Sequence, residues 1–223
     1  HQGVTRSAFA ALAAIAFVAG CGDAQPRVQT ATVPAASSAS SRSDFPSEPT
    51  PLPTFHSKRF QLTVPLPDGR AWKVDDQSQP HLVATHAPTR SEIQVWTSHE
   101  PNLMNRQRCE ERAREVGLVP KGPLDTLEDA ATIGPEAYDS RVWVALAPPR
   151  KGQPIAGHVF LFGAFIRKCL VVHFSTEIPS DAQEQALSDR LAMARTRIVG
   201  AITLDPPRTS ADVDLPRDKP KSP

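Results

Sequence analysis

The chain has 223 residues, and its 25 Lys and Arg nearly balance its 24 Asp and Glu, for a formal net charge of +1 at pH 7. Arg6 is the only charged residue among the first 21, so the rest of the chain is neutral with both signs interspersed. This balance gives no reason to expect nucleic acid or an anionic lipid surface as the ligand.

The chain opens with a segment typical of export. Residues 8–20 form an uninterrupted run of apolar or small residues, preceded by Arg6 and by no acidic residue. The run is shorter than the roughly 20 residues that a membrane-spanning helix needs, and this charge pattern is that of a secretory signal. The stretch Val18-Ala19-Gly20-Cys21 then resembles the lipobox of bacterial lipoproteins. An ordinary cleaved signal peptide is the alternative.

The lipobox resemblance implies where the protein works. It implies cleavage before Cys21, with 1–20 as the signal peptide, and acylation of Cys21. Two or three acyl chains anchor a protein firmly, since each buried CH₂ contributes about 0.8 kcal/mol. The residue after Cys21 is Gly22 and not the Asp associated with inner-membrane retention, which favours the outer membrane. We therefore expect a cell-envelope protein held to the membrane through Cys21, with its domain outside the cytoplasm.

Composition divides the remaining chain into three parts. Residues 21–54 are rich in Ala, Ser, Thr and Pro and predict a disordered tether, and 206–223 predict a disordered tail. Residues 55–205 are numerous enough to form one domain with its own core.

Two cysteines remain inside that domain. Cys109 and Cys169 are predicted to form a disulfide, because the compartments beyond the cytoplasmic membrane are oxidising. Two buried, inert thiols are the alternative.

The first part of the domain predicts an antiparallel meander. Phe60 to Val64 alternates apolar and polar residues, as a half-buried strand does, and Pro67-Asp68-Gly69 is turn chemistry. Three further strands are expected from Ala71 to Val74, from His81 to Thr85 and from Glu92 to Thr97.

A helix is expected next, with Asn102 as its N-cap and Gly117 beyond its C-terminus. Cys109, Ala113 and Val116 share one face at helical spacing, and the other positions are mostly charged or polar. Cys109 should therefore point toward the sheet, where Cys169 on a strand could meet it.

The second part of the domain carries the most β-prone segments. Residues 123–135 are weakly patterned and predict a short edge strand, and Arg141 to Leu146 predicts a stronger one. His158 to Ile166 and Cys169 to Thr176 predict a central hairpin that turns at Arg167-Lys168 and is covered on both faces. A last helix, to about Val199, is expected to begin with a capping box of Ser180 and Gln183.

Together these elements predict an α+β fold, a mainly antiparallel sheet of six or seven strands with helices packed on it. Phe60 to Pro65, Pro67-Asp68-Gly69 and Trp72 resemble the opening of the Mog/PsbP-like domains, although Arg70-Ala71 interrupts the tighter Gly-Trp version. The resemblance implies an α/β/α sandwich and a binding role, with no shared catalytic residues.

Catalytic and metal-binding motifs are not found in the sequence. His158 and His173 fall on neighbouring strands and are weak ligand candidates, but two imidazoles need further ligands to hold a metal. Ser175 is near His173 without a nucleophile elbow or an orienting carboxylate. We therefore expect no catalytic residues, no metal and no cofactor.

The expected function is a module that binds an envelope protein or a ligand. The alternatives are an envelope hydrolase that uses Ser and His, and a structural scaffold of the envelope.

Overall fold

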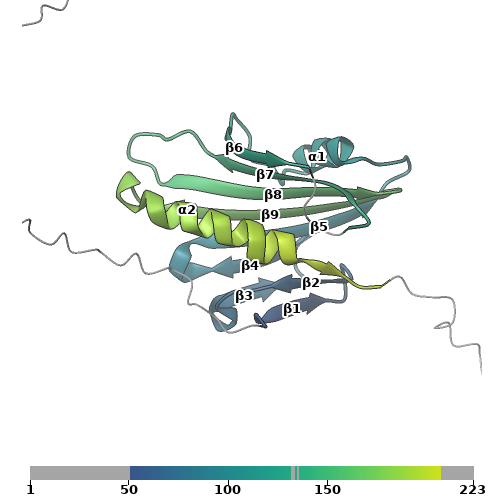
Figure 1. Cartoon of the computed structure of the whole chain (residues 1–223). Helices are drawn as coiled ribbons and strands as arrows, with labels where there is room; N and C mark the ends of the chain where they lie inside the picture. Colours follow the sequence, from purple (N-terminus) through teal and green to yellow (C-terminus); the bar gives the residue numbers. More distant parts are fainter. Residues whose placement is uncertain (1–50, 132–133, 135, 207–223) are drawn as a thin grey trace, which may run out of the picture. The chain divides into compact units, whose positions relative to one another are not determined.

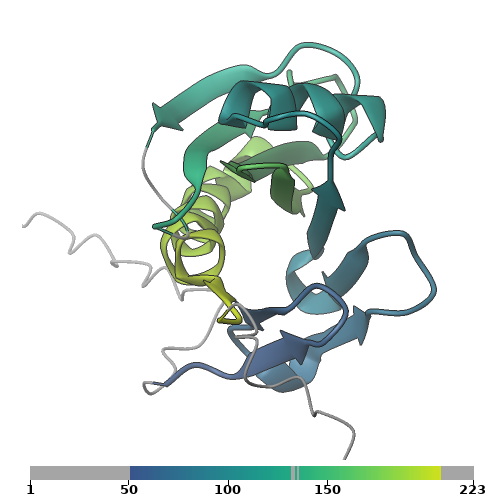
Figure 2. The ribbon, with the colours of Figure 1, turned by 90° about the vertical axis from the view of Figure 1, so that its right-hand side faces the viewer.

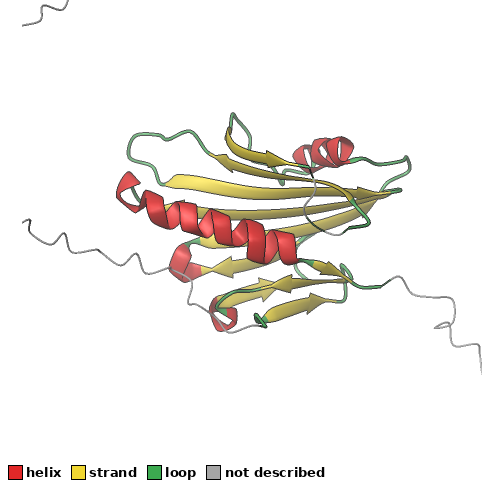
Figure 3. Cartoon of the chain, in the orientation of Figure 1, coloured by secondary structure: helices red, strands yellow, loops and turns green. Residues whose placement is uncertain are grey.

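A computed structural model describes residues 51–131, 134 and 136–206. The predicted signal peptide, Cys21, nearly all of the tether and the tail after residue 206 lie outside these described residues. Strands account for more of the described chain than helices do (Figure 3). No helix in this described part is long and apolar enough to cross a membrane.

The main feature is a seven-stranded antiparallel sheet with the order β3-β4-β5-β9-β8-β7-β6 (Figure 1). With the helices below, it confirms the predicted α+β class. Its longest strands, β8 and β9, form the predicted central hairpin, which turns at Ile166-Arg167, one residue earlier than expected. The strands are Trp72–Asp75 (β3), Leu82–His86 (β4), Ser91–His99 (β5), Asp125–Ala130 (β6), Asp139–Leu146 (β7), Ile155–Phe165 (β8) and Lys168–Ile178 (β9).

A second, three-stranded sheet has the order β1-β2-β10. Its strands are Thr54–Ser57 (β1), Leu62–Pro65 (β2) and Thr203–Leu204 (β10). The prediction that the first strand joins the following three in one meander was wrong. Pro65 ends β2 and Asp68 takes a left-handed conformation (φ 61°), so that a 3₁₀ turn, Gly69–Ala71 (η1), redirects the chain into the other sheet.

Helices pack on both faces of the large sheet, and the sheet separates the core into two clusters (Figure 2). Because side chains alternate along a strand, β8 sends Val159 and Leu161 to one core cluster and Phe160 and Phe162 to the other. The first cluster includes the leucines of helix α2 (Glu184–Met193) and the small sheet. The second includes the buried face of α1 (Arg106–Glu115).

Helix α1 begins later in the chain than the sequence predicts. The predicted N-cap, Asn102, is wrong, and Asn105 caps the helix by accepting a hydrogen bond from the backbone N–H of Arg108 (2.9 Å). Contacts with a distant part of the chain explain this difference. Glu100 and Met104 donate backbone hydrogen bonds to the β8–β9 turn, at Arg167 and Ile166, which keeps the chain extended until Asn105.

The end of α1 follows the prediction at Gly117 but not at Val116. Gly117 is left-handed (φ 81°), and its N–H and that of Leu118 bond to Arg114 and Ala113 in a Schellman motif. Val116, predicted on the apolar face, is 42% exposed. The motif turns the chain so that Leu118 joins the buried cluster instead.

The last helical region begins differently from the prediction. Ser180 makes no side-chain cap, because its carbonyl accepts the Gln183 N–H in a short 3₁₀ turn, Asp181–Gln183 (η3), so the capping box is wrong. Helix α2 follows, then a π-helical segment, Ala194–Ile198 (η4), and a 3₁₀ turn, Val199–Ala201 (η5). Gly157 lets α2 approach the sheet, since a Cβ there would lie 2.9 Å from a Leu187 methyl carbon.

Candidate functional site

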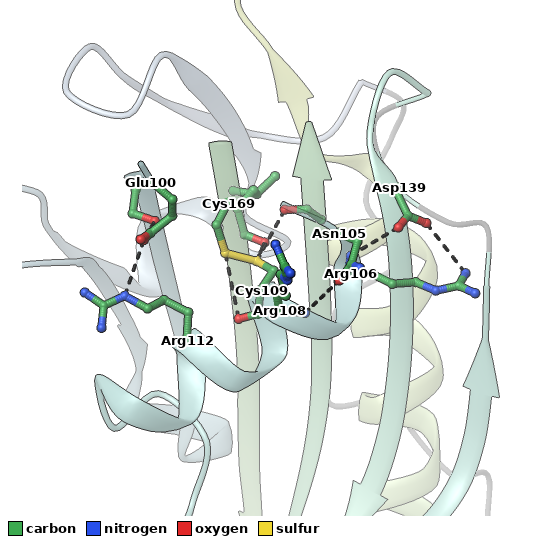
Figure 4. Close-up of a disulfide and its surroundings, with 11 residues drawn as sticks. Glu100, Asn105, Arg106, Arg108, Cys109, Arg112, Asp139 and Cys169 are labelled. Atoms are coloured by element: carbon green, nitrogen blue, oxygen red, sulfur yellow. Dashed lines mark hydrogen bonds and ion pairs between the residues drawn. A yellow bond between two sulfur atoms is a disulfide. The ribbon is translucent and has the colours of Figure 1, made fainter. Parts of the chain in front are cut away.

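The predicted disulfide is present between Cys109 and Cys169 (Figure 4). Cys109 lies in the first turn of α1 and Cys169 is the second residue of β9, and their Cα atoms are 5.5 Å apart. Both residues are almost completely buried. The bridge therefore fastens α1 to the sheet beside the β8–β9 turn.

The structure brings His158 and His173 together. They lie on adjacent strands, and His158 Nδ1 is 3.1 Å from His173 Nε2, so one imidazole donates a hydrogen bond to the other. Both rings stack in a row with Phe160 and are 7% exposed. Burial lowers the pKa of His158 to about 4, and burial together with the neighbouring His158 lowers the pKa of His173 to about 3. The pair is thus neutral at pH 7.

The chemistry open to this pair is limited. His173 Nδ1 is buried without a hydrogen-bond partner in the described structure. In the same described residues no cluster of three or more His, Cys, Asp or Glu could hold a metal. Ser175 pairs in register with His158, but no hydrogen bond joins its hydroxyl to either imidazole within the described part of the chain. The geometry does not favour the hydrolase alternative.

A buried polar chain joins four elements and was not predicted from the sequence. Asp68 accepts from, or shares a proton with, His86 (3.0 Å), whose other nitrogen is 2.7 Å from the Thr89 hydroxyl. The chain continues through Ser91 to Thr176 and ends where the Arg190 guanidinium donates to the Thr89 carbonyl (3.1 Å). His86, Thr89 and Ser91 are close in sequence, but Asp68, Thr176 and Arg190 are distant from them, so no motif spacing could have revealed the whole chain. Thr89 is only 2% exposed, so its hydroxyl is not an accessible nucleophile. The polar chain instead holds α2 to the sheet.

The surface is hollowed where α2 passes the β6–β7 end of the large sheet. Two hollows of about 430 and 650 Å³ adjoin there, because Leu146, Glu184 and Leu187 line both. Volumes of this size are usual for ligand sites. We call the combined hollow the aliphatic groove, because its apolar lining is aliphatic: Leu127, Val144, Leu146, Ile155, Ile178, Leu187 and Leu191.

Charged groups form the rim of the aliphatic groove. Arg195 donates to Glu128 (2.5 Å), which links the helical region to β6. Arg150 and Lys151, at the other end, make no ion pair within the described residues. The sequence correctly predicted a short edge strand here, but it gave no sign of a groove, because the residues that line it come from separate segments of the chain.

Edge strand β6 has an irregularity at the groove. Its pairing with β7 shifts register between Thr126 and Glu128, and Leu127 at the shift is 57% exposed and lines the groove. β6 is also the last strand in the sheet order, so its outer backbone groups have no strand partner among the described residues.

No protein-family model and no curated protein matches this sequence. Among solved structures, the chain is similar to the Saccharomyces cerevisiae Ran-binding protein Mog1p, with 9% identity, a TM-score of 0.45 and coverage of 69% of this chain and 96% of that one. A mutant form of Mog1 gives 8% identity, a TM-score of 0.45 and the same coverage. A Bacteroides thetaiotaomicron protein gives 7% identity and a TM-score of 0.40; the similarity covers 72% of this chain but only 50% of that protein. Likenesses of this size carry no inference about partner or activity.

Proposed function

We propose that this chain is a lipid-anchored binding module of the cell envelope that holds a segment of a partner protein in the aliphatic groove. The observation that carries the proposal is the groove itself, a surface hollow whose aliphatic floor comes from α2 and β7 and which is flanked by the exposed Leu127 of β6. A concave and mostly apolar hollow is the usual form of a ligand site.

The neighbouring strand supports a protein partner over a small molecule. An extended segment could add to the open edge of β6 through backbone hydrogen bonds and place an aliphatic side chain beside Leu127. Asp125 on this strand makes no ion pair within the described residues and favours a partner segment with a basic residue, whereas Glu128 is already paired with Arg195. Asp125 also disfavours pairing of β6 with the β6 of a second copy, because like charges would then come close together.

The groove can be tested with a photo-crosslinking residue placed on α2. p-Benzoylphenylalanine in place of Ser188, an exposed residue that lines the groove, should form a covalent adduct with one partner protein in the native cells. The same residue in place of Gln185, which is exposed on the same helix but does not line the groove, should not. Adducts are to be detected by immunoblotting and identified by mass spectrometry.

A second change tests whether the groove itself selects the partner. Leu127→Ser removes an exposed side chain, so it should leave the fold intact and weaken the Ser188 adduct at least tenfold. Equal adducts from positions 185 and 188, or an adduct unaffected by Leu127→Ser, would contradict the groove as the binding site.

The anchor is tested separately at Cys21. Cys21→Ser removes the thiol that the lipid would occupy, and we expect the protein to move from the membrane fraction to the soluble fraction of the envelope. Fractionation followed by immunoblotting measures this. The anchor proposal fails if Cys21→Ser protein stays in the membrane fraction after a wash at high salt.

A further inference from the structure

Three of the exposed large apolar residues lie at or beside the β8–β9 turn. Ile166 is 60% exposed in the turn, Phe165 precedes it and is 41% exposed, and Leu103 is 68% exposed. The backbone N–H of Met104, next to Leu103, donates to the Ile166 carbonyl (2.7 Å), so the two segments lie side by side. We call Leu103, Phe165 and Ile166 the hairpin tip.

The hairpin tip is held in a conformation that its sequence does not favour. Ile166 has a φ of 55°, a left-handed value that Gly adopts easily and that β-branched residues rarely adopt. Burial of the Ile166 side chain does not offset the cost of this conformation, because the side chain is exposed. Strain of this kind persists only where surrounding structure imposes it, and here the Cys109–Cys169 bridge fixes α1 to β9 immediately beside the turn (Figure 4).

Cations surround the hairpin tip and are not neutralised. Arg108, Arg167 and Lys168 are exposed and make no ion pair within the described residues. The nearby acidic groups are already engaged, Glu100 with Arg112 (3.3 Å) and Asp139 with Arg106 (3.8 Å). The net neutrality of the whole sequence therefore conceals three cations beside the tip that have no ion pair within the described residues.

We propose that the hairpin tip docks on an anionic lipid bilayer. Leu103, Phe165 and Ile166 would enter the interface, and Arg108, Arg167 and Lys168 would contact lipid phosphates, as apolar residues with a basic rim do in interfacial proteins. The tip projects from a turn and lines neither hollow of the aliphatic groove, so it suits a flat surface better than a protruding peptide. This inference does not depend on the groove.

The test is vesicle co-sedimentation of the full chain carrying Cys21→Ser, which excludes acylation. Vesicles of phosphatidylcholine with about one third phosphatidylglycerol should bind the protein, and vesicles of phosphatidylcholine alone should bind it much more weakly. Arg167→Gln with Lys168→Gln should lower binding to the anionic vesicles by about 25-fold, because each such charge contributes a factor of about five. The segment 8–20 is common to all variants, so differences between them report the tip.

Matched variants keep the result specific. Ile166→Asn places a polar residue that tolerates positive φ in the turn, so it should lower vesicle binding without lowering the melting temperature. Leu127→Asn, and Arg150→Gln with Lys151→Gln, change equally exposed groups elsewhere and should leave binding unchanged.

Three results would overturn the proposal. They are equal binding to neutral and anionic vesicles, binding that the tip variants leave unchanged, and a tip that binds an acidic protein but no vesicle.

Discussion

Replacing Cys109 and Cys169 together with Ala is expected to lower the free energy of unfolding by about 4 kcal/mol. The bridge joins residues 60 positions apart, and closing a loop of this length removes about that much conformational freedom from the unfolded chain in the chain-entropy model. The bridge is buried between α1 and β9 in the second core cluster, so the variant should lose stability without losing its strands. Urea unfolding followed by circular dichroism measures the difference.

Two comparisons separate the bridge from the cysteines as such. Cys21→Ser should leave the free energy of unfolding unchanged, because Cys21 takes no part in the bridge. Wild-type protein unfolded in the presence of a strong reductant should resemble the double variant. A double variant as stable as the wild type in oxidising buffer would show that the bridge contributes nothing.

The histidine pair should make the domain sensitive to mild acid. In the folded state the pKa of His158 is about 4 and that of His173 about 3, against about 6.5 in the unfolded chain. Between these values the unfolded chain binds more protons than the folded protein, so stability falls as pH falls. From pH 7 to pH 5 the expected loss is about 2 kcal/mol for each histidine, or about 4 kcal/mol for the pair.

This loss is measured as the change in unfolding free energy between pH 7 and pH 5. His158→Gln with His173→Gln should remove most of the pH dependence, whatever it does to the stability at pH 7. His99→Gln, at an exposed position of β5, serves as the control and should keep the wild-type dependence. An unchanged dependence in the double variant would show that other groups cause it.

Local patterns were enough to predict most elements but not how they assemble. The alternation in β7, the high β-propensity of β8 and β9 and the turn chemistry after β2 are all properties of neighbouring residues, and the structure contains these elements. The placement of β9 between β5 and β8, and the separation of β1, β2 and β10 into their own sheet, depend on contacts between distant residues. The error at Asn102 has the same origin, since backbone contacts with the β8–β9 turn decided where α1 begins, whereas at Ser180 a local 3₁₀ turn replaced the capping box.

The candidate sites divide in the same way. The Cys109–Cys169 pairing could be predicted because only two cysteines remained and an oxidising compartment favours their union. The aliphatic groove could not, because Leu127 and Leu187 are 60 positions apart and each looks ordinary alone. The cations around the hairpin tip were hidden by a balanced total charge, because composition does not record where charges gather.

The pairing of β10 with β2 also constrains the order in which the domain can assemble. Leu204, near the end of the described chain, pairs with Leu62 near its start, and His56 on β1 contacts the Asp205 carboxylate (2.9 Å). The β1–β2 hairpin leaves a ribosome or a translocon early, yet its third strand arrives only with the last part of the domain. Until then one edge of β2 is open to other chains, and vectorial delivery therefore leaves this small sheet as the last part to close.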